Sequence, residues 1–222
     1  MQHGRIPNEA GLPDAVEERF GTDLVAQARQ REGLAVHPPV VADVLPHLTP
    51  YLQANALLVS LAPKFTISQL SQMLGGFSRI ARMIPNAASM VGHGYNPVVF
   101  GPKVAGVKDT LRQILQPLGD CLEVAEEHLE IYAVVSAMSL TWIWPQLYHL
   151  RGIAEARGLS GDAALAALGE VLSGAVATMR ESGLSAKQVQ DLIPVSPLAD
   201  EAQAFVSAAD PKLAGLLEKL RP

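Results

Sequence analysis

Cysteine is nearly absent from this chain of 222 residues, which contains only Cys121. A single cysteine excludes an internal disulfide and a structural zinc cluster built on cysteines. We expect Cys121 to be a small buried hydrophobic residue. The sparing use of cysteine also suits a reducing, cytoplasmic location.

Aromatic residues make up 5% of the chain and charged residues 18%, whereas 49% of the residues are hydrophobic. This composition excludes intrinsic disorder and predicts a helix-favouring core of alanine, leucine, valine and isoleucine. The formal net charge is -5, so the chain lacks the basic field that binds a phosphate backbone. We therefore expect no nucleic-acid partner.

The opening residues, "MQHGRIPNEAGLPD", contain no apolar segment behind a basic one, and we expect no secretory signal. Residues 131–150 carry no formally charged side chain over about the length that spans a bilayer. Serine, proline, glutamine and histidine interrupt this stretch. A core helix or a dimer interface needs the same composition, so we expect one of these and no membrane partner.

The pattern of the chain changes near residue 125. Before it, short β-rich runs alternate with helical stretches, and after it the pattern is helical throughout. This predicts a nucleotide-binding domain over 1–125 and an all-helical domain over 126–222. The predicted fold class is α/β plus all-α, with a partial Rossmann-like parallel sheet, crossover helices and then a helical domain.

The first region contains five predicted strands and three predicted helices. The strands are 33–36, 55–62, 77–84, 96–101 and 121–124, and the helices are 39–52, 66–74 and 103–119. The apolar run 55–62 is typical of a strand buried on both faces of a parallel sheet. Thr66 is the predicted N-cap of its helix, and Gly75 and Gly76 are the predicted stop.

The second region is predicted to be a helical bundle. Its helices are expected over 126–157, 162–181, 185–193, 199–208 and 211–220. A bend is expected at Pro145, and Pro194, Pro197 and Pro211 are expected to separate the later helices. Small residues along 162–181 permit close packing between helices.

The stretch "RMIPNAASMVGHG", residues 82–94, places Pro85 and Asn86 directly after a predicted strand and then sets Gly92 and Gly94 two apart. Proline lacks an N–H and ends the ladder, which leaves Asn86 at the carboxyl end of the strand, where ligands of open α/β sheets bind. A binding loop explains these residues. A turn that merely joins two elements explains them as well.

Two further groups have a chemical and a structural interpretation. His93, with Tyr95 nearby, is either a proton donor close to Asn86 or an ordinary turn histidine. The set Glu126, Glu127, His128 and Glu130 does not match a known metal-ligand spacing. We interpret these side chains as a solvated helix start with favourable acids, and we expect no metal site.

Trp142, Trp144 and Tyr148 form an aromatic group on the predicted long helix. Trp144 and Tyr148 are four residues apart and therefore lie on one helix face. Packing in a core or a dimer contact accounts for such a group, and a ligand cage is the alternative.

Three segments together resemble a known family. The stretches "LAVHPPVVADVL" (34–45), "LLVSLAPKFTISQLSQMLGG" (57–76) and "RIARMIPNAASMVGHG" (79–94) have the order and spacing of the second half of the nucleotide domain in pyrroline-5-carboxylate reductases. The resemblance extends from residue 34 to about 200. It implies reduction of a cyclic imine with NADPH or NADH, a Rossmann domain, and a helical domain that intertwines with a second subunit in a homodimer.

The resemblance also implies a set of site residues. His37 and Pro38 match the loop after the fourth strand, where the family usually has lysine before proline to approach the cofactor. His37 departs from this pattern, and the alternative is an exposed loop histidine without a ligand. Pro85 and Asn86 match the part of the family that lies near the nicotinamide, while Ser136 and Ser196 match serines of the substrate site.

The sequence departs from the family pattern at the cofactor. No G-x-G-x-x-G occurs, although a dinucleotide fold binds pyrophosphate at the helix that follows this turn. Residues 1–33 read as one amphipathic helix without a strand and are too few for the missing half of the fold. Whether residue 1 is the natural start of the protein stays open.

The substrate motifs are altered too. The family pattern Ser-Gly-Ser-Gly-Pro-Ala-Tyr reads "SAMSLTW" over 136–142, and its Ser-Pro-Gly-Gly-Thr-Thr pattern reads "SPLADE" over 196–201. Asp200 and Glu201 would repel a substrate carboxylate. The resemblance therefore implies an NAD(P)-dependent reductase of a C=N bond or related group whose substrate is not pyrroline-5-carboxylate. A non-catalytic dimeric scaffold that has lost nucleotide binding is the alternative.

Overall fold

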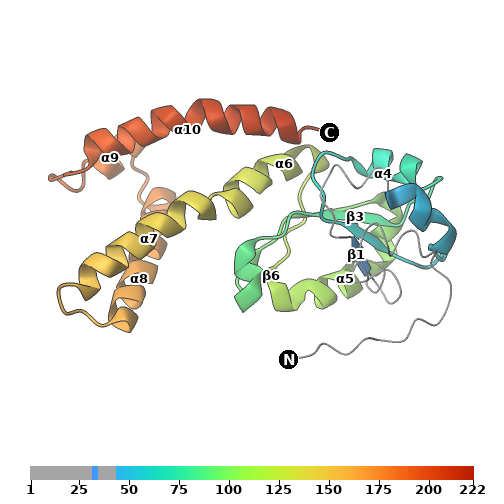
Figure 1. Cartoon of the computed structure of the whole chain (residues 1–222), viewed down its shortest axis with the longest axis horizontal. Helices are drawn as coiled ribbons and strands as arrows, with labels where there is room; N and C mark the ends of the chain where they lie inside the picture. The colour runs from blue at the N-terminus through green and yellow to red at the C-terminus, as the bar shows by residue number, and fades with distance from the viewer. Residues whose placement is uncertain (1–31, 35–43) are drawn as a thin grey trace. The chain divides into compact units, whose positions relative to one another are not determined.

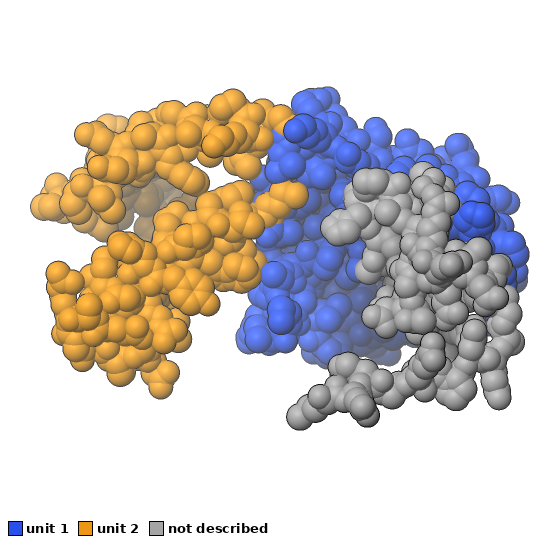
Figure 2. Space-filling model, in the orientation of Figure 1, with its two compact units in different colours: residues 1–137, 216–222 blue, residues 138–215 orange. Residues whose placement is uncertain are grey.

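The chain forms two compact units (Figure 2). The structure is a computed structural model that describes residues 32–34 and 44–222. The first unit, called the sheet unit here, contains residues up to Ala137 together with Leu216–Pro222, and the second, the helical unit, is Met138–Gly215. The predicted division of functional domains at residue 125 stays a prediction, since these units are defined by contacts alone.

A four-stranded sheet forms the centre of the sheet unit. Its order is β1 (Glu32–Leu34), β2 (Leu58–Ser60), β3 (Ile80–Met83) and β5 (Val98–Phe100). The first three strands are parallel, as predicted. β5 pairs with β3 in the antiparallel direction, so the prediction of a wholly parallel sheet was wrong there. The segment between β3 and β5 contains no α-helix, and two strands joined without a crossover run antiparallel.

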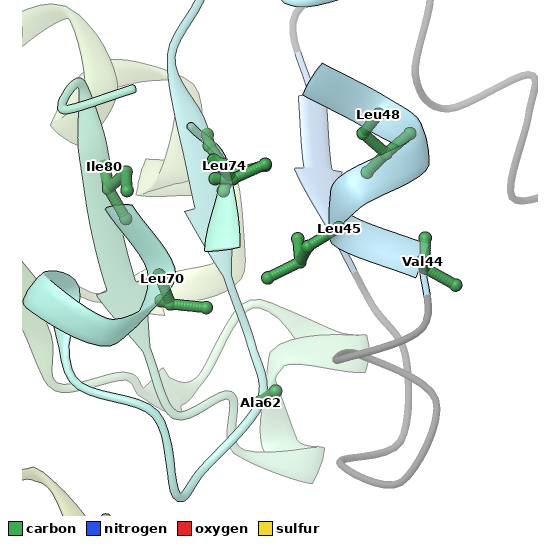
Figure 3. Packing of buried hydrophobic residues seen from close by; sticks show 8 residues of the cluster. Val44, Leu45, Leu48, Ala62, Leu70, Leu74 and Ile80 are labelled. Carbon is green, nitrogen blue, oxygen red and sulfur yellow. The ribbon is translucent and has the colours of Figure 1, made fainter. Parts of the chain in front are cut away.

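Apolar side chains cover both faces of this sheet. Leu58 and Ile80 belong to one buried cluster with residues from α4 (Ile67–Met73) and from the helical residues 44–48 (Figure 3). The next residue in each strand, Val59 and Ala81, belongs to the opposite cluster with residues of α5 (Lys108–Leu115). Successive side chains of a strand point to opposite faces, which gives the layered α/β/α core expected for a Rossmann-like fold.

Helix α4 begins and ends where the sequence predicts. Thr66 is its N-cap and forms a capping box with Gln69, in which the Thr66 hydroxyl accepts from the Gln69 N–H at 3.1 Å. Gly75 and Gly76 follow the helix with φ values of 62° and 94°. Only glycine adopts this region without strain, so the two glycines end the helix.

The remaining elements of the sheet unit are short. The 3₁₀ turns are η1 (Thr49–Tyr51), η2 (Ala87–Val91), η3 (Pro102–Val107), η4 (Gln116–Leu118) and η5 (Glu126–His128). The predicted helix 103–119 therefore consists of η3, α5 and η4. Instead of the predicted strand 121–124, β6 (Gly119–Asp120) pairs with β4 (Gly94–Tyr95), and Glu123 forms a single bridge with Val98.

The helical part begins with α6 (Leu129–Tyr132) and the π-helical segment η6 (Ala133–Met138), which belong to the sheet unit except for Met138. It continues with α7 (Leu140–Glu155), α8 (Gly161–Glu181), α9 (Ala186–Gln190) and α10 (Ala199–Leu220), labelled in part in Figure 1. The expected separation at Pro211 was wrong, because α10 runs through this residue. Proline removes one helical hydrogen bond, and the rest of the helix holds the segment together.

The helical unit has almost no interior of its own. Within Met138–Gly215, which the structure describes completely, Ala164 is the single buried residue. Trp144 and Tyr148 are 42% and 69% exposed, so they do not pack in a core of the chain. The dimer contact and the ligand cage stay predictions. Among the described helices, α8 alone is long and apolar enough to cross a membrane, a property it shares with many core and interface helices.

Candidate functional site

The loop between β3 and β5 places Asn86 beside the carboxyl end of β3. Ile84 continues the hairpin, since its N–H donates to the Pro97 carbonyl at 3.1 Å. Pro85 is exposed, and the chain then turns into η2. Asn86 caps η2, because its side-chain oxygen accepts from the Ala88 N–H at 2.8 Å. The residue is 8% exposed, so the loop buries an amide at the sheet edge where ligands of α/β proteins bind.

The backbone conformation and the tight packing of this loop require its two glycines. Gly92 ends η2 with φ at 74°, the left-handed region that favours glycine. A Cβ atom on Gly94 would lie 2.5 Å from the Leu118 carbonyl oxygen and 2.0 Å from the Ser89 hydroxyl oxygen. The glycines are therefore required by the fold of the loop itself, whether or not a ligand approaches it.

Asn96 anchors the loop from its far end. This side chain is fully buried, and its oxygen accepts from the Asn86 N–H at 2.8 Å and from the Ser89 hydroxyl at 2.9 Å. Its amide nitrogen donates to the Leu118 carbonyl at 3.3 Å. Nearly all of its bonding capacity is used inside the loop, which holds Asn86 in one position. The sequence analysis missed this residue, although an asparagine before Pro97 is a common sign of a structured turn.

Asn86 also connects the loop to the π-helical segment. Its side-chain N–H donates to the main-chain carbonyl of Ser136, and the Ser136 hydroxyl donates to the Tyr132 carbonyl at 2.7 Å. A π-helix releases carbonyl groups from the regular helical pattern, and such segments recur at functional sites. The resemblance assigns one of these residues to the cofactor site and the other to the substrate site, and the structure brings them together.

A buried ion cluster lies on the same strand. Arg82 of β3 is fully buried, and its guanidinium donates to Glu126 at 3.0 Å and to Glu130. Glu126 also accepts from the Ile67 N–H at 2.7 Å, at the start of α4. The predicted solvated acidic helix start was therefore wrong for Glu130, which is 7% exposed. Two features of the sequence could have indicated this cluster: an arginine within an apolar strand, and two acids four residues apart on one helix face.

The other predicted site residues fall into three groups. His37 and Pro38 lie outside the described residues. Ser196 lies in the helical unit, is exposed, and its carbonyl accepts from the Ala199 N–H at the start of α10. His93 is exposed in the turn after Gly92. Among the described residues, no group of His, Cys, Asp and Glu side chains is arranged to hold a metal ion.

A separate hollow of about 370 Å³ lies within the helical unit. It is lined largely by apolar side chains: Trp142, Phe205, Val206, Ala208, Ala209, Asp210, Lys212 and Leu213. Trp142 faces this hollow together with Phe205, so part of the predicted aromatic group contributes to an open surface. Its lining carries one acid and one lysine and no arrangement typical of a catalytic site.

The sheet unit has features that fit part of a dinucleotide site. Strands β1, β2 and β3 are parallel, so their carboxyl ends share one edge, and Asn86 lies at that edge. The chain contains no glycine-rich turn to receive the pyrophosphate. Among the described residues, the Asn86 loop therefore lies at the edge where ligands of such sheets bind. A bound nicotinamide cofactor would supply hydride there.

Comparisons with known proteins find relatives among the pyrroline-5-carboxylate reductases. No protein-family profile matches the chain. The pyrroline-5-carboxylate reductase 3 of Rattus norvegicus is 25% identical over 158 residues, which cover 70% of this chain and 57% of that protein. The chain thus spans little more than half the length of this curated relative.

Solved structures give the same family. The pyrroline-5-carboxylate reductase of Coxiella burnetii superposes with a TM-score of 0.56 and 25% identity, covering 93% of this chain and 80% of that chain. The pyrroline carboxylate reductase of Plasmodium falciparum, solved with NADP bound, superposes with a TM-score of 0.58 and 23% identity over 87% of this chain and 78% of that chain. In sequence and fold, the chain is therefore similar to pyrroline-5-carboxylate reductases, at about 25% identity.

Proposed function

We propose that this protein is an NAD(P)-dependent oxidoreductase that reduces a C=N bond or a related group. The observation that carries the proposal is the bond from the Asn86 side chain to the Ser136 carbonyl, at the carboxyl edge of the parallel strands. By the resemblance, this bond would join the loop near the nicotinamide to the segment near the substrate. The solved relative with NADP bound supports the choice of cofactor.

Titration with NADPH and NADH tests this proposal. Nicotinamide fluorescence and the thermal unfolding midpoint are followed together. A cofactor at 100 times its Kd stabilises the folded state by about 2.7 kcal/mol, so binding with a Kd below about 0.1 mM supports the proposal. A flat response with both cofactors contradicts it.

We further propose that the substrate is not pyrroline-5-carboxylate itself. Asp200 and Glu201 occupy the first turn of α10, where both are exposed. The resemblance places the carboxylate-binding hydroxyls of the family at this point of the sequence, and two carboxylates would repel an anionic substrate. A neutral or cationic imine suits these residues better.

Turnover of two imines with NADPH tests the choice of substrate. 1-Pyrroline, which lacks the carboxylate, should be reduced with a kcat/KM at least tenfold above that of pyrroline-5-carboxylate. The double variant Asp200→Gly and Glu201→Thr should narrow this ratio, because it removes both charges. A wild-type preference for pyrroline-5-carboxylate contradicts the proposal.

The second candidate is a non-catalytic scaffold that has lost nucleotide binding. The absence of a glycine-rich turn from the sequence favours it. A homodimer is proposed in both cases, because the helical unit buries only Ala164 and exposes many large apolar side chains. Sedimentation as a dimer together with a flat cofactor titration favours the scaffold, whereas a dimer that binds NADPH favours the reductase.

The remaining partner and location assignments are proposals of the same kind. The net charge of -5 supports an absence of nucleic-acid partners. The free thiol of Cys121 supports a reducing, cytoplasmic location. We propose that α8 contacts a second copy of the chain rather than a lipid bilayer, since many interface helices are equally apolar.

A further inference from the structure

Two tyrosines meet beside the Asn86 loop. Tyr95 lies in β4 and Tyr132 in α6, and their ring centroids are 6.3 Å apart with an angle of 38° between the ring planes. Aromatic pairs at this separation attract one another and orient both rings. Tyr95 remains 41% exposed, so part of this residue is open to solvent.

The contacts around this pair form a closed circuit that includes Asn86. Tyr95 directly precedes Asn96, whose side-chain oxygen accepts from the Asn86 N–H at 2.8 Å. The Asn86 side chain donates to the Ser136 carbonyl. The Ser136 hydroxyl donates to the Tyr132 carbonyl at 2.7 Å, and the Tyr132 ring contacts the Tyr95 ring. Both ends of the tyrosine pair are thus attached to the Asn86 loop through buried or half-buried groups.

Reduction of an imine requires a proton donor as well as hydride. Among the titratable groups near the loop, Tyr95 has its pKa raised above the ordinary value, first by burial and then by Tyr132 and by Asp120 of β6. The phenol is therefore fully protonated at neutral pH. Tyrosine is an established type of general acid, and the exposed part of Tyr95 lets water restore its proton.

We propose that Tyr95 is the proton donor of the reductase site and that Tyr132 positions its ring. In the step, the carbon of the C=N bond gains hydride, with its electron pair, from the dihydronicotinamide, which becomes the oxidised cation. The π electrons move to nitrogen, and this nitrogen takes the proton from the Tyr95 hydroxyl. The phenolate then takes a proton from water. This inference rests on the proposed function, because it needs a nicotinamide beside Asn86.

The sharpest test compares NADP⁺ with NADPH on the same phenol. The ionisation of tyrosine is followed by absorbance near 295 nm, and the Tyr95 step is identified by its loss in Tyr95→Phe, which keeps the ring contact. The oxidised ring is positively charged and the reduced ring is neutral. NADP⁺ should therefore lower the Tyr95 midpoint by about one pH unit relative to NADPH, since an adjacent positive charge favours the phenolate.

Tyr148→Phe is the matched control, because Tyr148 is 69% exposed on α7 in the helical unit. This variant should retain the cofactor-dependent shift. Binding of both cofactors is measured separately by fluorescence and by calorimetry. If both cofactors bind and the Tyr95 midpoint is the same with each, the inference is wrong while the proposed function stands. If neither binds, the proposed function is wrong and the inference fails with it.

Turnover provides a second readout. With 1-pyrroline and NADPH, Tyr95→Phe should lower kcat by about 10²-fold or more, while the Kd for NADPH changes less than twofold. Tyr148→Phe should leave both quantities unchanged. An unaltered kcat in Tyr95→Phe overturns the assignment of Tyr95 as the donor.

Discussion

Arg82 is a charged residue in the interior of a sheet. Its side chain is fully buried and forms ion pairs with Glu126 and Glu130. Its Nε atom has no hydrogen-bond partner among the described residues. A buried ion pair stabilises little in itself, yet removal of one partner leaves the other charge buried and uncompensated.

We therefore expect Arg82→Met to lower the free energy of unfolding by about 3–5 kcal/mol in urea titrations. Arg112→Met is the matched control. Arg112 pairs with Glu123 at 2.8 Å on the surface, where the loss of an ion pair costs about 1 kcal/mol or less. If both variants lose the same free energy of unfolding, the buried ion cluster stabilises the fold no more than a surface ion pair does.

Cys121 should react slowly for a partly exposed thiol. Burial, and secondarily the charge of Asp120, raises the pKa of this thiol. We expect alkylation by iodoacetamide at pH 8 to be slower in the folded chain than in urea, with its pH midpoint at a higher value. The neutral thiol is the favoured form in the folded state, so its contribution to stability is present below the ordinary pKa and is lost as pH rises through the folded pKa.

Asp120→Asn tests the electrostatic part of this cause. Removal of the neighbouring negative charge should move the midpoint of alkylation down, part of the way to the unfolded value. If the pH midpoint of alkylation of the folded wild-type chain equals that of the unfolded chain, the expected rise in the pKa of Cys121 is contradicted.

At the scale of single elements, α4 depends on the cap at its first turn. Thr66→Ala removes the hydroxyl, which accepts from the Gln69 N–H and donates to the Gln69 side-chain oxygen, and keeps the bond from the Thr66 N–H to that oxygen. The change should cost about 1 kcal/mol in thermal or urea unfolding. Thr178→Ala is a control inside α8, where the hydroxyl bonds only to the Gly174 carbonyl of its own helix. Its loss should be about 0.5 kcal/mol or less.

The same element shows what the sequence can predict. Thr66 caps α4 with its hydroxyl, and Gly75 and Gly76 end it with their positive φ values. All three act on residues within one helical turn, so local patterns locate both ends of α4. The position of Asn86 after β3 was predicted for the same reason, because Pro85 ends the strand locally. Local signals were sufficient wherever the cause lies within a few residues.

Where the sequence-based predictions were wrong or incomplete, the structure depends on residues that lie far apart in the chain. Arg82 finds its acids more than forty residues later, and no local pattern couples them. The direction of β5 depends on the absence of a crossover helix from the segment before it. The contact between the rings of Tyr132 and Tyr95 joins residues that lie far apart in the sequence. Tertiary structure, rather than propensity, decided each of these cases.

At the scale of the whole molecule, the helical unit exposes apolar side chains that the proposed dimer would cover. Val171, Val176 and Met179 of α8 are 65%, 60% and 72% exposed. We expect Val176→Glu to weaken self-association at least tenfold, or about 1.4 kcal/mol, in sedimentation velocity over a concentration series. Lys187→Glu, an exposed charge change on α9, is the control and should leave association within twofold. A compact monomer of the wild-type chain at all concentrations would contradict the proposed dimer.

The final residues Leu216–Pro222 belong to the sheet unit, and Leu220 among them is 6% exposed. The helical unit is therefore an insertion within the chain of the sheet unit, with sheet-unit residues on either side of it. A premature stop codon or a protease cut before Leu216 would damage both units at once. An engineer who wishes to isolate the sheet unit must excise the middle of the gene and rejoin its two flanks.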